Sequence, residues 1–173
     1  GEAGCGKSHL MGDIASKRIE AALPTLLLLG TTFKNPTTNG QNIVVHLGLS
    51  CTFSELLDDL NQLGLRIGSR VLILIDAINE GLGAGLWRDQ IAGFVNQISK
   101  YPAIALSLTI RSTYFKNIIP ESFIDSRDVT IITHKGFAGN EYEALRLFCT
   151  YYDLELPSFP LLNPEYANPL FLH

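Results

Sequence analysis

The chain has 173 residues, 46% of them hydrophobic, and a formal net charge of −4 at pH 7. This length fits one domain with a sizeable core, and the acidic balance without a Lys/Arg cluster argues against direct nucleic-acid binding. No apolar run is long enough to span a bilayer, and three widely spaced cysteines suggest neither zinc nor a disulfide framework, so we expect a cytoplasmic protein with reduced thiols.

The chain opens on the motif G-x-x-x-x-G-K-S, the phosphate-binding loop of nucleoside triphosphatases. Its glycines let the backbone curl around an anion, and a helix starting here adds its positive dipole. Lys7 can reach the β- and γ-phosphates and the Ser8 hydroxyl can bind Mg²⁺, whereas the alternative is a chance match in a Gly-rich turn. The residues expected to bind nucleotide are Gly1, Glu2, Ala3, Gly4, Cys5, Gly6, Lys7, Ser8 and, through its backbone N–H, His9.

The chain starts at Gly1 without the strand that should precede such a loop, and without an initiator Met or a targeting segment. We therefore interpret it as a fragment that is cut at the loop. The missing strand should lie in the sheet interior, in the neighbourhood of the strand that ends at Asp76, because the loop must face the acids there. We expect the piece alone to be unstable.

The first part of the chain after the loop alternates between helix and strand. Residues 10–22 carry apolar side chains at helical spacing, and residues 25–33 form an apolar run that predicts a strand. Residues 43–49 are ambiguous between a short helix and a strand. Thr52 and Glu55 have the spacing of a capping box, which predicts a helix beginning there.

Residues 70–76 are a β-branched and Leu-rich run that ends in Asp76, as expected for a strand buried on both faces of a parallel sheet. Open α/β sheets bind ligands at the carboxyl ends of their strands, so Asp76 can hold Mg²⁺ across from the phosphate loop. Glu80 follows at a distance that suits a base for the attacking water. The structural alternative is a turn and a helix cap.

The second half continues the alternation. Residues 87–98 predict a helix with Trp87 packed on its apolar face, and residues 103–110 predict a strand. Residues 128–133 predict a further strand, and Asn140 can cap another helix. This alternation predicts an α/β fold with a mainly parallel sheet and helices on both faces.

Arg111 follows the predicted strand 103–110, in the sequence Thr109-Ile110-Arg111-Ser112. If this strand lies beside the strand that ends at Asp76, Arg111 also faces the phosphates. An arginine there can stabilise charge on the transferring phosphoryl group or sense the γ-phosphate. A surface arginine that closes a strand is an equally good interpretation of this residue alone.

In this order the motifs resemble those of STAND-class P-loop NTPases, in particular the bacterial antiviral branch related to NACHT domains. GEAGCGKSHL resembles the Walker A segment, LILIDAINEG the Walker B segment with its second acid, and LTIRSTY the sensor-1 strand that ends in Arg. The run from ITHKGF to Asn168-Pro169-Leu170 is similar to the approach to the family's small-residue–Pro–hydrophobic motif. The likeness covers nearly the whole chain.

The resemblance implies a P-loop three-layer sandwich over residues 1–156, and a Pro-rich connection with the start of a helical lobe over residues 157–173. It implies a switch that holds ADP at rest and ATP when triggered, with Lys7, Glu80 and Arg111 catalytic, Ser8 and Asp76 on Mg²⁺, and Pro169 near the adenine. It also implies self-association on activation and a phage protein as trigger, bound by C-terminal repeats that this chain lacks.

Two alternatives remain open at this point. The chain could be an interaction module that binds nucleotide with negligible turnover, although Glu80 argues against a pure binder. It could also be another P-loop enzyme, such as a helicase-like motor or a kinase. The spacing of Asp76 and Glu80 and the terminal Asn-Pro-Leu disfavour a kinase, and the acidic charge disfavours a nucleic-acid motor.

Overall fold

The computed structural model describes residues 1–124, 126, 128–156 and 164–172. The chain forms two compact units, one of residues 8–130 and the other of residues 1–7 with residues 131–173. Each unit is described by itself below. The expected domain boundary after residue 156 stays a prediction, and residues 157–163 of the predicted Pro-rich connection lie outside the described residues.

The larger unit is built on a sheet of three parallel strands in the order β1-β2-β3. The register pairs Leu29 with Asp76 and Ile75 with Leu108, so the three strands end at nearly the same level. Both edges of β2 are paired, so a further strand could join this sheet only beside β1 or β3. The strands are β1 (Thr25–Leu29), β2 (Val71–Asp76) and β3 (Ile104–Leu108).

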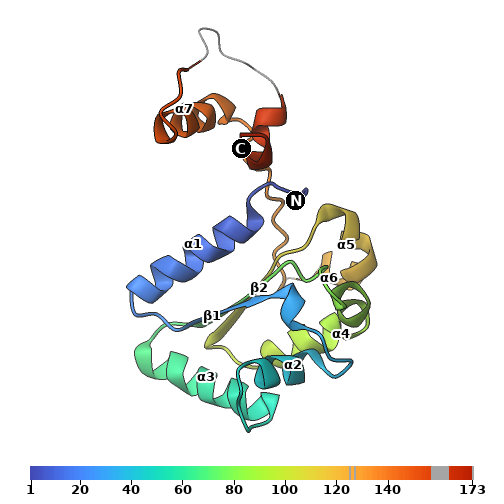
Figure 1. Cartoon of the computed structure of the whole chain (residues 1–173). Helices are drawn as coiled ribbons and strands as arrows, with labels where there is room; N and C mark the ends of the chain where they lie inside the picture. Colours follow the sequence, from blue (N-terminus) through green and yellow to red (C-terminus); the bar gives the residue numbers. More distant parts are fainter. Residues whose placement is uncertain (125, 127, 157–163, 173) are drawn as a thin grey trace. The chain divides into compact units, whose positions relative to one another are not determined.

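Helices cover both faces of this sheet, as predicted (Figure 1). On one face, Met11 and Ala15 of α1 pack against Leu74, whereas Ile73 and Ile75 point to the main core under α2, α3 and α4. Neighbouring strand residues point to opposite faces, so β2 is buried on both sides. These helices are α1 (Lys7–Glu20), α2 (Asn39–His46), α3 (Phe53–Ile67) and α4 (Gly83–Ile98).

Aromatic side chains fill the centre of the main core. Trp87 is fully buried, with its ring centroid 4.9 Å from that of Phe33 and 5.2 Å from that of Phe94. Phe94 in turn stacks on Phe53 at 5.5 Å. The prediction that Trp87 packs in the core is therefore confirmed.

The capping box at the start of α3 is also confirmed. The Thr52 hydroxyl accepts a hydrogen bond from the Glu55 N–H, and the Glu55 carboxylate accepts one from the Thr52 N–H at 2.7 Å. The ambiguous stretch 43–49 lies mostly in α2, whose first turn is capped by the Thr38 hydroxyl. A local side-chain cap therefore selects helix over strand in this stretch.

Two strand predictions need correction. The strand predicted over residues 25–33 ends at Leu29, because Gly30 starts a turn of 3₁₀ helix, η1 (Gly30–Thr32), against the chain after β2. A Cβ atom at Gly30 would lie 2.0 Å from the Ala77 carbonyl oxygen, so only glycine fits this approach. Residues 128–133 form no strand, because a strand needs a hydrogen-bonded neighbour and the described strands leave this segment unpaired.

Two short helices that the sequence did not predict follow β3, namely α5 (Ser112–Ile118) and α6 (Glu121–Ile124). In the smaller unit, Leu145 and Cys149 of α7 are buried against Tyr166. Asn140 precedes α7 as predicted, but its side chain makes no capping hydrogen bond. The elements of this unit are α7 (Glu141–Tyr151) and the 3₁₀ turns η2 (Pro164–Ala167) and η3 (Pro169–Leu172).

Across the described ranges, no helix combines the length and the apolar character that a transmembrane span requires.

Candidate functional site

The first part of the candidate site lies where β2 and β3 end. Asp76, the last residue of β2, is only 4% exposed, and its Oδ1 accepts a hydrogen bond from the Thr109 hydroxyl. The Thr109 N–H donates to the Ile75 carbonyl at 3.0 Å and so extends the pairing of β3 with β2 by one residue. The parallel register thus places the predicted metal ligand beside a threonine from the neighbouring strand.

The chain turns sharply after Asp76. Ala77 has a positive φ of 55°, a conformation that costs a non-glycine residue about 1–2 kcal/mol. This turn is held by hydrogen bonds from the Ala77 N–H to the Thr109 hydroxyl at 2.8 Å and from the Ile78 N–H to the Thr109 carbonyl at 3.0 Å. The Glu80 N–H closes the turn onto the Ala77 carbonyl at 2.9 Å. A strained backbone is thus fixed between the two predicted acids.

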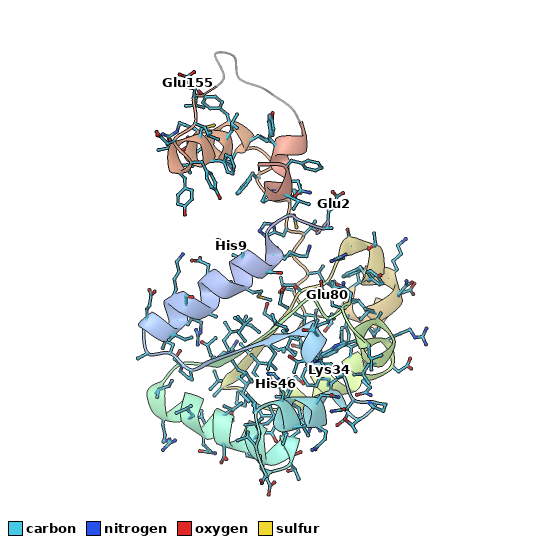
Figure 2. The ribbon with its side chains drawn as sticks, in the orientation of Figure 1. Glu2, His9, Lys34, His46, Glu80 and Glu155 are labelled. Carbon is cyan, nitrogen blue, oxygen red and sulfur yellow. The ribbon has the colours of Figure 1, made fainter. Side chains whose placement is uncertain are left out.

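Glu80 and Arg111 meet each other at this end of the sheet. An Arg111 guanidinium nitrogen lies 3.2 Å from Glu80 Oε1, and both side chains are nearly half exposed. The Arg111 N–H also donates to the Asn79 side chain at 3.0 Å, and Asn79 is buried. Figure 2 shows Glu80 at the end of the sheet where α5 begins. Two residues proposed for catalysis from separate motifs are therefore direct neighbours.

The loop of residues 1–7 belongs to the smaller unit. Gly4 and Gly6 have φ values of 74° and 89°, which side chains disfavour, so the motif's glycines are needed for its curled backbone. The Lys7 ammonium donates to the Gly1 carbonyl at 3.1 Å and to the Glu2 carbonyl, and lies 3.4 Å from the Cys5 sulfur. The loop thus wraps around its own lysine.

The segment Asn168-Pro169-Leu170 packs against this loop within the same unit. The Asn168 amide donates to the Ala3 carbonyl at 3.0 Å, and its oxygen accepts from the Leu170 N–H at 3.1 Å. A Cβ atom at Gly6 would lie 3.6 Å from Pro169 Cγ. Pro169 is therefore next to the loop, and its contact with adenine stays a prediction.

The larger unit holds the other predicted site residues. Glu80 and Arg111 are paired there and Asp76 ends β2 nearby in the chain, whereas Ser8 and His9 lie in the first turn of α1. Among the described residues, neither Ser8 nor His9 is bonded to any of those three. The reader can locate His9 on α1 and Glu80 in Figure 2. The loop residues from Gly1 to Lys7, together with Pro169, belong to the smaller unit.

Within the described ranges, no group of three or more His, Cys, Asp or Glu side chains could hold a metal ion. Mg²⁺ in nucleotide sites usually takes only one or two protein oxygens and completes its shell with phosphates and water. Asp76 fits this role, because one oxygen is bonded by Thr109 while the described residues give the other no hydrogen bond.

The sequence singled out neither Thr109, which bonds Asp76 and the Ala77 N–H, nor Asn79, whose side chain accepts a hydrogen bond from the Arg111 N–H. The available signal was the threonine directly after an apolar strand and the asparagine between Asp76 and Glu80. Comparison with known proteins adds no relative: no family model matches the chain, and no curated protein matches it.

Proposed function

We propose that this chain is the nucleotide-binding core of an ATP-hydrolysing switch with the P-loop fold, of the STAND class, and that it hydrolyses ATP slowly with Mg²⁺. The observation that carries this proposal is the group Asp76, Glu80 and Arg111 at the carboxyl ends of two neighbouring parallel strands. That edge is where open α/β sheets bind ligands. The G-x-x-x-x-G-K-S loop and its positive-φ glycines support the same chemistry.

Each residue takes one role in this proposed chemistry. Loop N–H groups and Lys7 would bind the phosphates, and Ser8 and Asp76 would hold Mg²⁺, which neutralises charge on the β- and γ-phosphates. Glu80 would orient and deprotonate the attacking water, because it is exposed enough to reach solvent and stands at the end of the sheet. Arg111 would leave Glu80 for the γ-phosphate.

The wider function in the proposal comes from the resemblance alone. It comprises an ADP-bound resting state, self-association on ATP binding and activation of an attached effector in antiviral defence. A phage protein as trigger belongs to the same expectation. The core proposal of nucleotide binding and hydrolysis does not depend on these points and is tested first.

The interaction module with negligible turnover is the second candidate function. The ion pair between Glu80 and Arg111 favours it to the extent that the base is engaged by a neighbouring side chain. Exposed ion pairs of this kind contribute about 0.2–1 kcal/mol, too little to keep Glu80 from a reaction. Hydrolysis is therefore the better conclusion.

The first test is nucleotide binding by Lys7→Ala. Lys7 is the only cationic side chain of the loop, so the variant should lose measurable affinity for both ATP and ADP in titration calorimetry. Lys17→Ala is the matched control, because Lys17 is exposed on α1 and pairs with Asp13 on the same helix, at 2.7 Å. Affinity of Lys7→Ala within a few-fold of the parent would show that this loop is not the phosphate site.

A further inference from the structure

Thr109 makes four hydrogen bonds to the segment that carries Asp76. Its N–H and carbonyl bond Ile75 and Ile78, each at 3.0 Å, and its hydroxyl bonds both the Ala77 N–H and Asp76. Thr109, the residue directly after β3, therefore bonds four consecutive residues, 75–78, and these include the predicted metal ligand. The backbone bonds extend the sheet, whereas the hydroxyl bonds depend on the threonine side chain.

The direction of the hydroxyl bonds follows from simple counting. The Ala77 N–H can only donate, so it occupies a lone pair of the Thr109 oxygen. The single hydroxyl proton is then left for Asp76 Oδ1, which must accept it. This bond fixes the rotation of a nearly buried carboxylate, and Oδ2, which has no hydrogen bond among the described residues, keeps both of its lone-pair directions open for another partner.

We propose that Thr109 is a positioning residue that orients the Asp76 carboxylate so that Oδ2 receives Mg²⁺ from the Mg²⁺–nucleotide complex. This inference rests on the proposed function, since it assigns the geometry of the same metal site. Partners that hydrogen-bond a metal-ligating carboxylate fix its orientation, and losing one typically costs about 10–100-fold in metal affinity. Arg111 and Glu80 act on the nucleotide directly, whereas Thr109 acts through Asp76.

The buried surroundings make this orientation matter. Asp76 is 4% exposed, so few water molecules can replace a lost partner at Oδ1. Without the hydroxyl, the Ala77 N–H in its left-handed turn also loses its acceptor. The carboxylate would then be free to rotate toward that N–H and turn its oxygens away from the metal position.

Thr109→Val tests the inference because valine keeps the branched shape of threonine and removes only the hydroxyl. The readout is ADP affinity by calorimetry, measured with EDTA and with MgCl₂, so no turnover is required. We expect the affinity in EDTA to stay at the parent value and the affinity gained from Mg²⁺ to fall by about 10–100-fold. Thr109→Ser should restore the parent's Mg²⁺ dependence, since serine supplies the same hydroxyl.

Thr113→Val is the matched control, because Thr113 lies on α5, is exposed and makes no side-chain hydrogen bond among the described residues. If Thr109→Val does not fold, Thr109→Cys replaces it, since its thiol takes the position of the hydroxyl, although it is larger, and is only a weak donor. Thermal unfolding of each variant with EDTA separates loss of structure from loss of metal affinity.

The outcomes separate this inference from the proposal on which it rests. Mg²⁺ dependence in Thr109→Val or Thr109→Cys equal to that of the parent would overturn the role of Thr109 alone. A Thr109→Ser variant as impaired as the valine variant would overturn it too, because the hydroxyl would not be the active group. If the parent chain is folded and its ADP affinity is independent of Mg²⁺, both the proposed nucleotide site and this inference are refuted.

Discussion

Replacing Arg111 with alanine should distinguish ATP from ADP. In the structure the Arg111 guanidinium pairs with Glu80 at 3.2 Å. We propose that the guanidinium moves to the γ-phosphate when ATP binds. ADP lacks that phosphate, so Arg111 makes no such contact with ADP. Arg111→Ala should therefore weaken binding of a non-hydrolysable ATP analogue and leave ADP binding nearly unchanged.

The size of the effect follows from the geometry. With Glu80 42% and Arg111 46% exposed, their ion pair contributes about 0.2–1 kcal/mol. A hydrogen bond from the guanidinium to a charged phosphate oxygen contributes about 1.5–3 kcal/mol. Replacing the ion pair with Glu80 by the hydrogen bond to the γ-phosphate therefore favours ATP binding by about 1–2 kcal/mol, which is about 5–30-fold in affinity.

Titration calorimetry with ADP and with the ATP analogue, both with Mg²⁺, measures this difference. Arg88→Ala is the control, because Arg88 is also exposed and pairs with its neighbour Asp89. Equal losses for the two nucleotides would refute the reasoning and assign the Arg111 side chain a structural role through its ion pair with Glu80. An unchanged affinity for both would show that Arg111 stays with Glu80.

Two further predictions concern the fold that carries the site. Hydrogen bonds from the Thr52 backbone and hydroxyl hold the pKa of Glu55 below its usual value. The contribution of Glu55 to stability is therefore present above its unfolded-state pKa and is lost as the pH falls through its folded-state pKa. Glu55→Gln should therefore lower the urea midpoint at pH 7 but not at acidic pH below both pKa values, and an equal change at both would contradict the capping role. Trp87→Ala should cost about 3–5 kcal/mol in urea unfolding because the side chain is fully buried. Trp87→Phe should cost much less, since the indole N–H has no partner among the described residues, and equal costs for the two would contradict this account.

Local chemistry made part of the fold predictable from the sequence. The capping box at Thr52 needs only residues three positions apart, and the run 70–76 needs only its own composition to indicate a strand buried on both faces. The glycines of the first loop likewise follow from backbone sterics, as their positive φ values confirm. Each of these features depends on interactions within a few residues.

Features that depend on distant neighbours were predicted less well. The bond between Thr109 and Asp76 joins residues 33 positions apart and depends on the register of β2 with β3, which composition does not specify. The early end of β1 depends on how closely Gly30 approaches Ala77. The run 128–133 has strand composition but no neighbour to pair with among the described strands, so propensity alone misled the prediction.

The central claim is that this chain hydrolyses ATP with Glu80 as the base, and ATP turnover by Glu80→Gln tests it most directly. Glutamine keeps the shape and can still accept a hydrogen bond from Arg111, but it cannot take a proton from water. Glu121→Gln, an exposed position on α6, is the matched control. We expect Glu80→Gln to bind Mg²⁺–ATP like the parent and to release phosphate roughly 10²–10⁴-fold more slowly. Turnover at the parent rate would contradict the account.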